Sequence, residues 1–157
     1  MRDEIIAAGP LDEPGTIGRL TFLEACILET GRLFPPVTRT IHVAPEGDTF
    51  DGTSIKAGME IWQYFPARYR DTSVDPKAND FDPNKWVYSG MERRSRYPNL
   101  FLSGARACPG EGLILFMCKA AIAILTERQR VRLCSRPLAN DPLPFSFSNG
   151  AVRFHSG

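Results

Sequence analysis

The segment from Pro109 to Arg128 constrains the fold more than any other part of the chain. It holds an apolar stretch, Gly112 to Leu125, that is interrupted only by Lys119. This stretch falls short of the roughly 20 residues that a helix needs to span a bilayer, so we expect a helix that packs within a protein. The apolar positions of this helix share one broad face that we predict to be core: Leu113, Phe116, Met117, Ala120, Ile124 and Leu125.

The composition is that of an ordinary globular protein. The chain has 157 residues, 43% hydrophobic and 24% charged, which favours a single domain over residues 1–157. The 19 basic and 18 acidic side chains nearly cancel, so electrostatics give no case for nucleic acid or an anionic membrane as the main partner. The N-terminal sequence has no apolar signal-peptide core and no segment reads as transmembrane, so we expect a cytoplasmic protein.

The remaining pattern predicts an α+β fold, with two main helices and small antiparallel sheets. Besides the helix above, helical spacing of apolar residues predicts a helix from Ile17 to Phe34, where Pro35-Pro36 ends it. Gly31 within it costs about 1 kcal/mol relative to alanine, so its presence needs a reason. The other expected elements are a helix at Arg2–Ala8, strands at Arg39–Ala44, Thr53–Ile55 and Met59–Phe65, a long loop over 66–99, and a hairpin of 145–148 with 151–154 around Asn149-Gly150.

The four cysteines form no C-x-x-C pair, so neither a zinc site nor a disulfide framework is indicated. Cys26, Cys118 and Cys134 are expected to be buried, small apolar side chains. Cys108 differs, because Pro109-Gly110 and the apolar helix follow it directly.

The surroundings of Cys108 favour a thiolate. Free N–H groups and the dipole at a helix N-terminus stabilise an anion, and Arg106 adds positive charge nearby. Gly104 and Gly110 permit tight backbone turns around the sulfur. A nucleophilic cysteine would need a histidine base, and nothing local ties His42 or His155 to Cys108. A soft thiolate ligand to the iron of a haem fits better.

Three motifs in order carry a family resemblance. Residues 101–110 read F-x-x-G-x-R-x-C-x-G and resemble the haem-binding loop of the cytochrome P-450 family. Upstream, Glu29-Thr30-Gly31-Arg32 resembles the family's E-x-x-R helix, and Arg70-Asp71 followed by residues 81–86 resembles the segment before its meander. The resemblance covers nearly all of this chain but only the C-terminal portion of the family's fold. It divides the chain into a helix and loop at 1–16, the E-x-x-R helix and sheet at 17–65, the meander and cysteine loop at 66–108, and a helix and hairpin at 109–157.

The resemblance implies haem b as cofactor, with the Cys108 thiolate as the axial iron ligand. It places Arg106 and Arg39 toward the haem propionates and Phe101 beneath the macrocycle, with Gly110 completing the binding loop. It assigns Glu29, Arg32 and Lys85 to a structural network. The sequence departs from the family at three positions: Lys85 replaces an arginine, Gly31 an apolar residue, and Glu111 a common basic residue.

The long distal helix with the acid–alcohol pair that activates dioxygen has no counterpart in these residues, so we expect a truncated family member. A haem bound here would have a bare distal face. That exposed apolar face predicts a homodimer, a partner or a substrate that covers it.

Three functional hypotheses follow. The first is a haem-thiolate oxidoreductase that acts on a hydrophobic natural-product intermediate in secondary metabolism, is not self-sufficient as a monooxygenase, and takes a redox partner near Arg93-Arg94-Ser95-Arg96. The second is a haem-free, repurposed enzyme that guides a cyclisation, isomerisation or cycloaddition. The third is a non-catalytic fragment. Candidate polar groups for the second are Arg39, Tyr64, Arg70 and Arg106.

Overall fold

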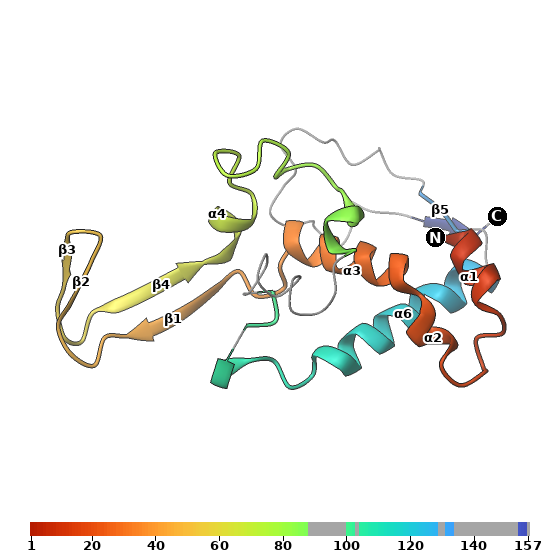
Figure 1. Ribbon diagram of the computed structural model, residues 1–157, viewed down its shortest axis with the longest axis horizontal. Coiled ribbons are helices and arrows are strands. Elements are labelled where there is room, and N and C mark those ends of the chain that lie inside the picture. Colours follow the sequence, from red (N-terminus) through yellow and green to blue (C-terminus); the bar gives the residue numbers. More distant parts are fainter. Residues whose placement is uncertain (88–99, 103, 129–130, 134–153, 157) are drawn as a thin grey trace.

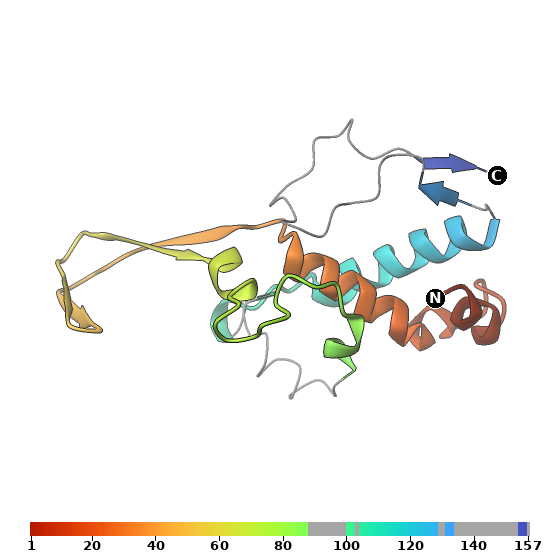
Figure 2. The ribbon, with the colours of Figure 1, turned by 90° about the horizontal axis from the view of Figure 1, so that it is seen from above.

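The computed structural model describes residues 1–87, 100–102, 104–128, 131–133 and 154–156. Within these residues a helical body carries a long β-ribbon that projects away from it (Figures 1 and 2). The α+β prediction is therefore confirmed. The elements are α1 (Arg2–Ala8), α2 (Thr16–Arg19), α3 (Thr21–Leu33), β1 (Arg39–Val43), β2 (Asp48–Phe50), β3 (Thr53–Ile55), β4 (Glu60–Tyr64), α4 (Phe65–Tyr69), the 3-10 helices η1 (Pro83–Trp86) and η2 (Gly104–Arg106), α6 (Glu111–Arg128), β5 (Val131–Leu133) and β6 (Phe154–Ser156).

The N-terminal helices differ from the prediction at one point. Helix α1 has the predicted bounds, but the helix predicted from Ile17 to Phe34 is divided into α2 and α3. Leu20 makes the break, with a ψ of 73° that is outside the helical range, and its side chain is fully buried. Burial of Leu20 in the core thus takes precedence over an unbroken helix.

Glu4 of α1 caps the start of α3. Its carboxylate accepts hydrogen bonds from the backbone N–H groups of Phe22, at 2.6 Å, and Leu23, at 2.9 Å. These N–H groups have no partner within their own helix, and the helix dipole favours a negative charge at this end. Glu4 therefore ties the first helix of the chain to α3.

The β-ribbon consists of two antiparallel pairs. Strand β1 pairs with β4, with Ile41 opposite Trp62, and β2 pairs with β3 farther along the chain. The turn between β2 and β3 is the predicted Asp51-Gly52 turn, whose residues have φ of 46° and 73°, as a tight hairpin requires. All five residues of β4 are exposed.

The core lies between α3 and its helical neighbours and comprises two clusters. The first joins α1, α2, α3 and α6, and the second joins α3, η1 and α6. Their fully buried members are Ile5, Ile17, Leu20, Leu23 and Ala123 in the first cluster, and Ala25, Leu28, Trp86 and Leu115 in the second.

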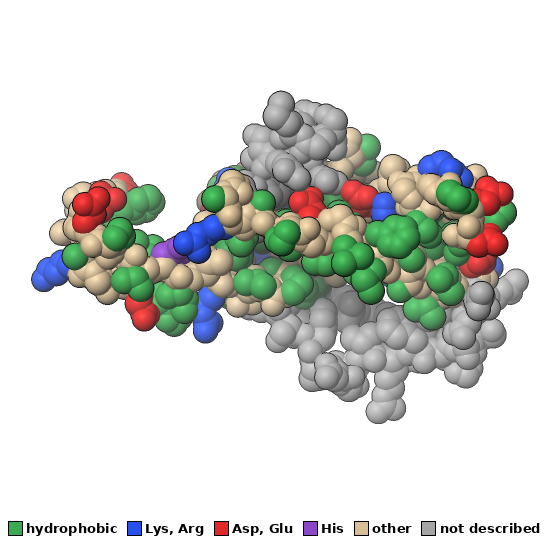
Figure 3. Space-filling model, turned by 90° about the horizontal axis from the view of Figure 1, so that it is seen from below, with side chains coloured by type: hydrophobic (Ala, Val, Ile, Leu, Met, Phe, Trp, Pro, Cys, Tyr) green, Lys and Arg blue, Asp and Glu red, His purple; other side chains and the backbone are tan. Residues whose placement is uncertain are grey.

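The predicted core face of α6 is wrong. The buried positions are Leu115, Lys119 and Ala123, whereas Leu113 is 64% exposed and Met117 is 60% exposed. Because α6 is apolar on every side, its sequence periodicity cannot select the face that meets α3. Figure 3 shows hydrophobic side chains over the helical body when the molecule is seen from below. Of the predicted face only Ala120 packs against the core; Phe116, Ile124 and Leu125 are exposed.

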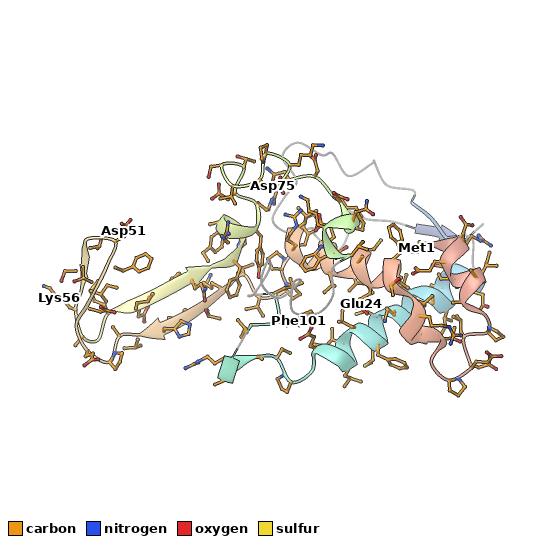
Figure 4. All side chains as sticks on the ribbon, in the orientation of Figure 1. Met1, Glu24, Asp51, Lys56, Asp75 and Phe101 are labelled. Atoms are coloured by element: carbon orange, nitrogen blue, oxygen red, sulfur yellow. The ribbon has the colours of Figure 1, made fainter. Side chains whose placement is uncertain are left out.

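An ion pair joins α6 to α3. The ammonium of Lys119, a residue only 5% exposed, donates to Glu24 Oε2 at 2.8 Å. Figure 4 shows Glu24 between the two helices. Lys119 can thus occupy a buried position of an apolar helix because its positive charge is paired with a carboxylate of α3.

The C-terminal sheet is a short antiparallel pair in which Leu133 lies opposite Phe154. The predicted hairpin of 145–148 with 151–154 lies, except for Phe154, outside the described residues, as do Cys134 and the arginines at 93–96. Within the part of the chain that the structure describes, no helix has the length and apolar character to cross a membrane.

Candidate functional site

Glu29 and Arg32 form a buried ion pair one turn apart on α3. Arg32 Nε donates to Glu29 Oε2 and Arg32 Nη2 donates to Glu29 Oε1, both at 2.7 Å. The two residues are 0% and 1% exposed. Two charges removed from water in this way need every remaining donor and acceptor to be satisfied.

The guanidinium of Arg32 is satisfied by backbone carbonyls from the segment that follows α4. Its Nη1 donates to the carbonyls of Tyr69 and Ala78, both at 2.6 Å, and its Nη2 donates to that of Asp80 at 3.0 Å. With the two bonds to Glu29, every N–H donor of the guanidinium has an acceptor. Arg32 therefore fixes the course of a loop that has little regular structure of its own.

The carboxylate of Glu29 is satisfied from the same segment. The backbone N–H of Asp82 donates to Oε1 at 2.9 Å, and the indole Nε1–H of Trp86 donates to Oε2 at 2.8 Å. Each carboxylate oxygen thus accepts two hydrogen bonds. Glu29 and Arg32 together bind residues 69–86 to α3.

The cysteine loop turns back on itself before α6. The N–H of Cys108 donates to the carbonyl of Phe101 at 2.7 Å, and the N–H of Ala107 donates to the carbonyl of Gly104 at 3.1 Å. Gly104 has a φ of 62° and Leu102 a φ of 60°. Positive φ is uncommon for leucine, so the loop holds Leu102 in a conformation that costs free energy.

The loop presents Cys108 at the start of α6. The carbonyl of Cys108 accepts the N–H of Glu111 at 3.3 Å, and that of Gly110 accepts the N–H of Ile114 at 2.8 Å. The Cys108 side chain is half-buried. A Cβ atom on Gly110 would lie 3.8 Å from Cys108 Sγ, so glycine at this position leaves space beside the sulfur.

Comparison with known proteins identifies the family. The family model described as cytochrome P-450 matches residues 3–153 of the chain.

The chain belongs to the cytochrome P-450 family.

Individual P-450 relatives agree with this assignment. Cytochrome P-450 734A5 of Oryza sativa subsp. japonica is 30% identical over 139 residues, which cover 84% of this chain and 26% of that protein. Cytochrome P-450 monooxygenase pkfB of Emericella nidulans is 27% identical over 164 residues, which cover 95% of this chain and 30% of that protein. The chain thus spans about a quarter to a third of the length of these relatives.

A solved P-450 structure shares the fold. The crystal structure of the cytochrome P-450DA haem domain superposes with a TM-score of 0.70 at 22% identity, covering 87% of this chain and 30% of that one. The chain therefore has the fold of a part of a P-450 haem domain.

Lys85 has a different role from the one implied by the P-450 resemblance. Its ammonium donates to Asp75 Oδ2 at 2.7 Å and to the carbonyl of Lys77 at 3.1 Å. Within the described ranges it has no hydrogen bond or ion pair with Glu29 or Arg32. The hydrogen bond from Lys85 holds the pKa of Asp75 below its usual value. The compact ammonium of lysine reaches one carboxylate and lacks the forked N–H groups with which a guanidinium could reach a second. The contact to Glu29 comes from the neighbouring Trp86.

The two arginines assigned to the propionates lie on separate elements. Arg106 is exposed in η2, and Arg39 is exposed at the start of β1, where its guanidinium lies 4.8 Å from the ring centroid of Trp62. Among the described residues neither guanidinium has a hydrogen-bond acceptor, and no hydrogen bond or ion pair joins Arg39 to the cysteine loop. Both remain able to receive a carboxylate.

Phe101 lies at the junction of the network and the loop. It is half-buried against the second core cluster, to which Trp86 and Leu115 belong, and Figure 4 shows it beneath α3. The carbonyls of Tyr69 and Ala78 could not be identified as acceptors from the sequence, since backbone acceptors carry no side-chain pattern. The indole N–H donor of Trp86 is a sequence signal that could have indicated a buried acceptor.

Proposed function

We propose that this region is the haem-thiolate seat of a cytochrome P-450 oxidoreductase, with the Cys108 sulfur as the axial ligand of the iron. The presentation of Cys108 at the start of α6, with no side chain at Gly110 beside its sulfur, carries the proposal. A thiolate is one of the ligands by which proteins hold haem iron.

The residues present fit a haem. Arg106 and Arg39 have unused N–H donors for the propionates, and Phe101 offers an aromatic ring beside the loop. In the proposal Cys108 holds the iron, the arginines bind the propionates, Phe101 packs beneath the ring, and Gly110 keeps the approach to the sulfur clear. A bound haem supplies the redox-active iron for oxidation.

We further propose that the substrate is a hydrophobic small molecule of secondary metabolism and that electrons come from a redox partner. The relative from Emericella nidulans is named as a monooxygenase, which supports oxidation as the reaction class. Because the chain spans only about a quarter of its Oryza relative, the proposal assigns to these residues the ligand and its support, and not complete monooxygenation.

Haem binding to the purified protein tests this proposal. We expect a stoichiometric complex whose reduced carbon-monoxide form has a thiolate-type Soret band, and we expect Cys108→Ser to lose that band. Cys118→Ser is the matched control, since Cys118 is another half-buried cysteine of the same region and should retain the band. Absence of stoichiometric haem from the unmodified protein, or an unchanged band in Cys108→Ser, would overturn the proposal. The first of these outcomes would leave the haem-free cyclisation hypothesis in front.

A further inference from the structure

Gly31 permits a close contact between α3 and the cysteine loop. A Cβ atom at position 31 would lie 3.4 Å from Leu100 Cδ1, so the Leu100 side chain rests on the helix where glycine leaves room. Any side chain that extends beyond Cβ at position 31 would occupy the space that Leu100 now fills. This contact gives a reason for a glycine inside a helix, where it is otherwise unfavourable.

The contact lies one residue from the hydrogen bond that holds the cysteine. Leu100 precedes Phe101, and the carbonyl of Phe101 accepts the N–H of Cys108 at 2.7 Å. A backbone shift at Leu100 would therefore act directly on the Phe101 carbonyl and on its hydrogen bond to Cys108. The path from Gly31 to the sulfur consists of one packing contact, one peptide unit and one hydrogen bond.

The second core cluster, to which Trp86 belongs, supports the same two residues. Leu100 and Phe101 pack against the cluster that contains Trp86 and Leu115. The indole of Trp86 is itself fixed by its hydrogen bond to Glu29. The start of the cysteine loop is thus held between α3, η1 and α6, and Gly31 is the position where a single substitution would add volume to that contact.

We propose that the Gly31–Leu100 contact positions the Cys108 sulfur, which makes Gly31 and Leu100 positioning residues for the thiolate ligand. The inference rests on the proposed function for its consequence at the haem, but the placement of the sulfur can be measured without haem. A larger side chain at position 31 displaces the sulfur, and removal of the Leu100 side chain compensates for it.

The test compares four variants with the unmodified protein. Gly31→Leu adds volume against Leu100, whereas Gly31→Ala adds only a Cβ at an ordinary contact distance. The double variant Gly31→Leu with Leu100→Ala exchanges the volumes of the two side chains. Gly18→Leu is the matched control, because Gly18 is also helical and has nothing within 4 Å of its Cβ position.

The first readout is the alkylation rate of each cysteine in the haem-free protein, resolved by peptide mass spectrometry. We expect Gly31→Leu to change the rate at Cys108 by about threefold or more, because cysteine reactivity follows the surroundings of the sulfur. Cys26 and Cys118 should react at unchanged rates. Gly31→Ala and Gly18→Leu should match the unmodified protein, and the double variant should return the Cys108 rate toward it.

The second readout is the share of bound haem that gives the thiolate-type Soret band, compared at equal haem content. We expect Gly31→Leu to lower this share about twofold or more and the double variant to restore it. If Gly31→Leu does not fold, Leu100→Ala alone replaces it, with a change in the Cys108 alkylation rate again expected.

Two results separate this inference from the proposed function. An unchanged alkylation rate at Cys108 in the folded Gly31→Leu variant, or in Leu100→Ala, would overturn the positioning role whether or not haem binds. Failure of the unmodified protein to bind haem would overturn the proposed function, while the alkylation rates would still decide the role of Gly31.

Discussion

Helices α3 and α6 differ in the charged side chains that one buries and the apolar side chains that the other exposes. Helix α3 encloses Glu29 and Arg32, which are 0% and 1% exposed. Helix α6 contains the most apolar stretch of the chain, and yet Leu113 and Met117 are 64% and 60% exposed. These charged groups of α3 are buried because hydrogen-bond partners surround them. These apolar side chains of α6 are exposed because no described residue packs over them.

This difference indicates what each helix is for. The charged groups of Glu29 and Arg32 on α3 are satisfied by residues 69–86 of the same chain. Helix α6 is apolar on all sides, which is typical of a helix that is covered all round. Its outer face is thus suited to a contact that the described residues do not make, while its inner face and its N-terminus support the cysteine loop.

The largest expected effect is the removal of Arg32. Arg32→Ala leaves the buried Glu29 carboxylate without its charge partner and removes the arginine donors from three backbone carbonyls, and should lower the free energy of unfolding by about 3–5 kcal/mol. Urea unfolding, or loss of soluble protein, measures this. Arg32→Lys should not restore the loss, since an ammonium cannot replace the fork. Arg68→Ala, at an exposed arginine, is the control. An equal loss of stability at both arginines would contradict the stabilising role of the buried hydrogen bonds of Arg32.

The second prediction compares two apolar positions of α6. Leu115→Ala should lower the free energy of unfolding by about 2–4 kcal/mol, because Leu115 is buried in the second core cluster. Met117→Ala should change it by less than about 0.5 kcal/mol, because this side chain is largely exposed. If chemical unfolding gives similar losses in the free energy of unfolding for the two variants, the outer face of α6 is covered in solution and not exposed.

A smaller effect is expected at the start of α3. Glu4→Gln removes the negative charge that caps Phe22 and Leu23, and should lower the free energy of unfolding by about 1 kcal/mol. Thermal unfolding monitored by circular dichroism measures the loss. Asp3→Asn removes an exposed acidic charge from the same helix and should be nearly silent; a larger effect there would argue against capping by Glu4.

The smallest effect is expected at the Lys85–Asp75 pair. The side chain of Asp75 is 43% exposed, so solvent screening limits the loss in Asp75→Asn to about 0.5 kcal/mol at neutral pH. Because Lys85 lowers the pKa of Asp75, the pair stabilises the fold above about pH 4 and ceases to do so as the pH falls through the lower pKa of the folded state. Unfolding curves of the two proteins should therefore converge in acid. A difference that persists at low pH would mean that the pair is not the cause.

The sequence predicted those features that depend on local pattern. Helix α1, strand β3 and the Asp51-Gly52 turn follow from capping, alternation and turn chemistry. The break at Leu20 and the buried face of α6 could not be predicted, because both depend on which distant side chains share the core. Spacing likewise brought Cys108, Arg106 and Gly110 into one loop, but nothing local showed that Lys85 binds Asp75 and that Trp86 binds Glu29.

The proposal that the Cys108 sulfur is the haem ligand can be tested by the alkylation rates of the cysteines, measured with and without haem. The protein is saturated with haem, treated with an alkylating reagent, and each cysteine is quantified by peptide mass spectrometry. We expect haem to slow the alkylation of Cys108 by about tenfold or more, because the coordinated sulfur is no longer a free nucleophile. The alkylation rates of Cys26 and Cys118 should not change. If Cys108 is alkylated at the haem-free rate under full haem occupancy, its sulfur is not the haem ligand.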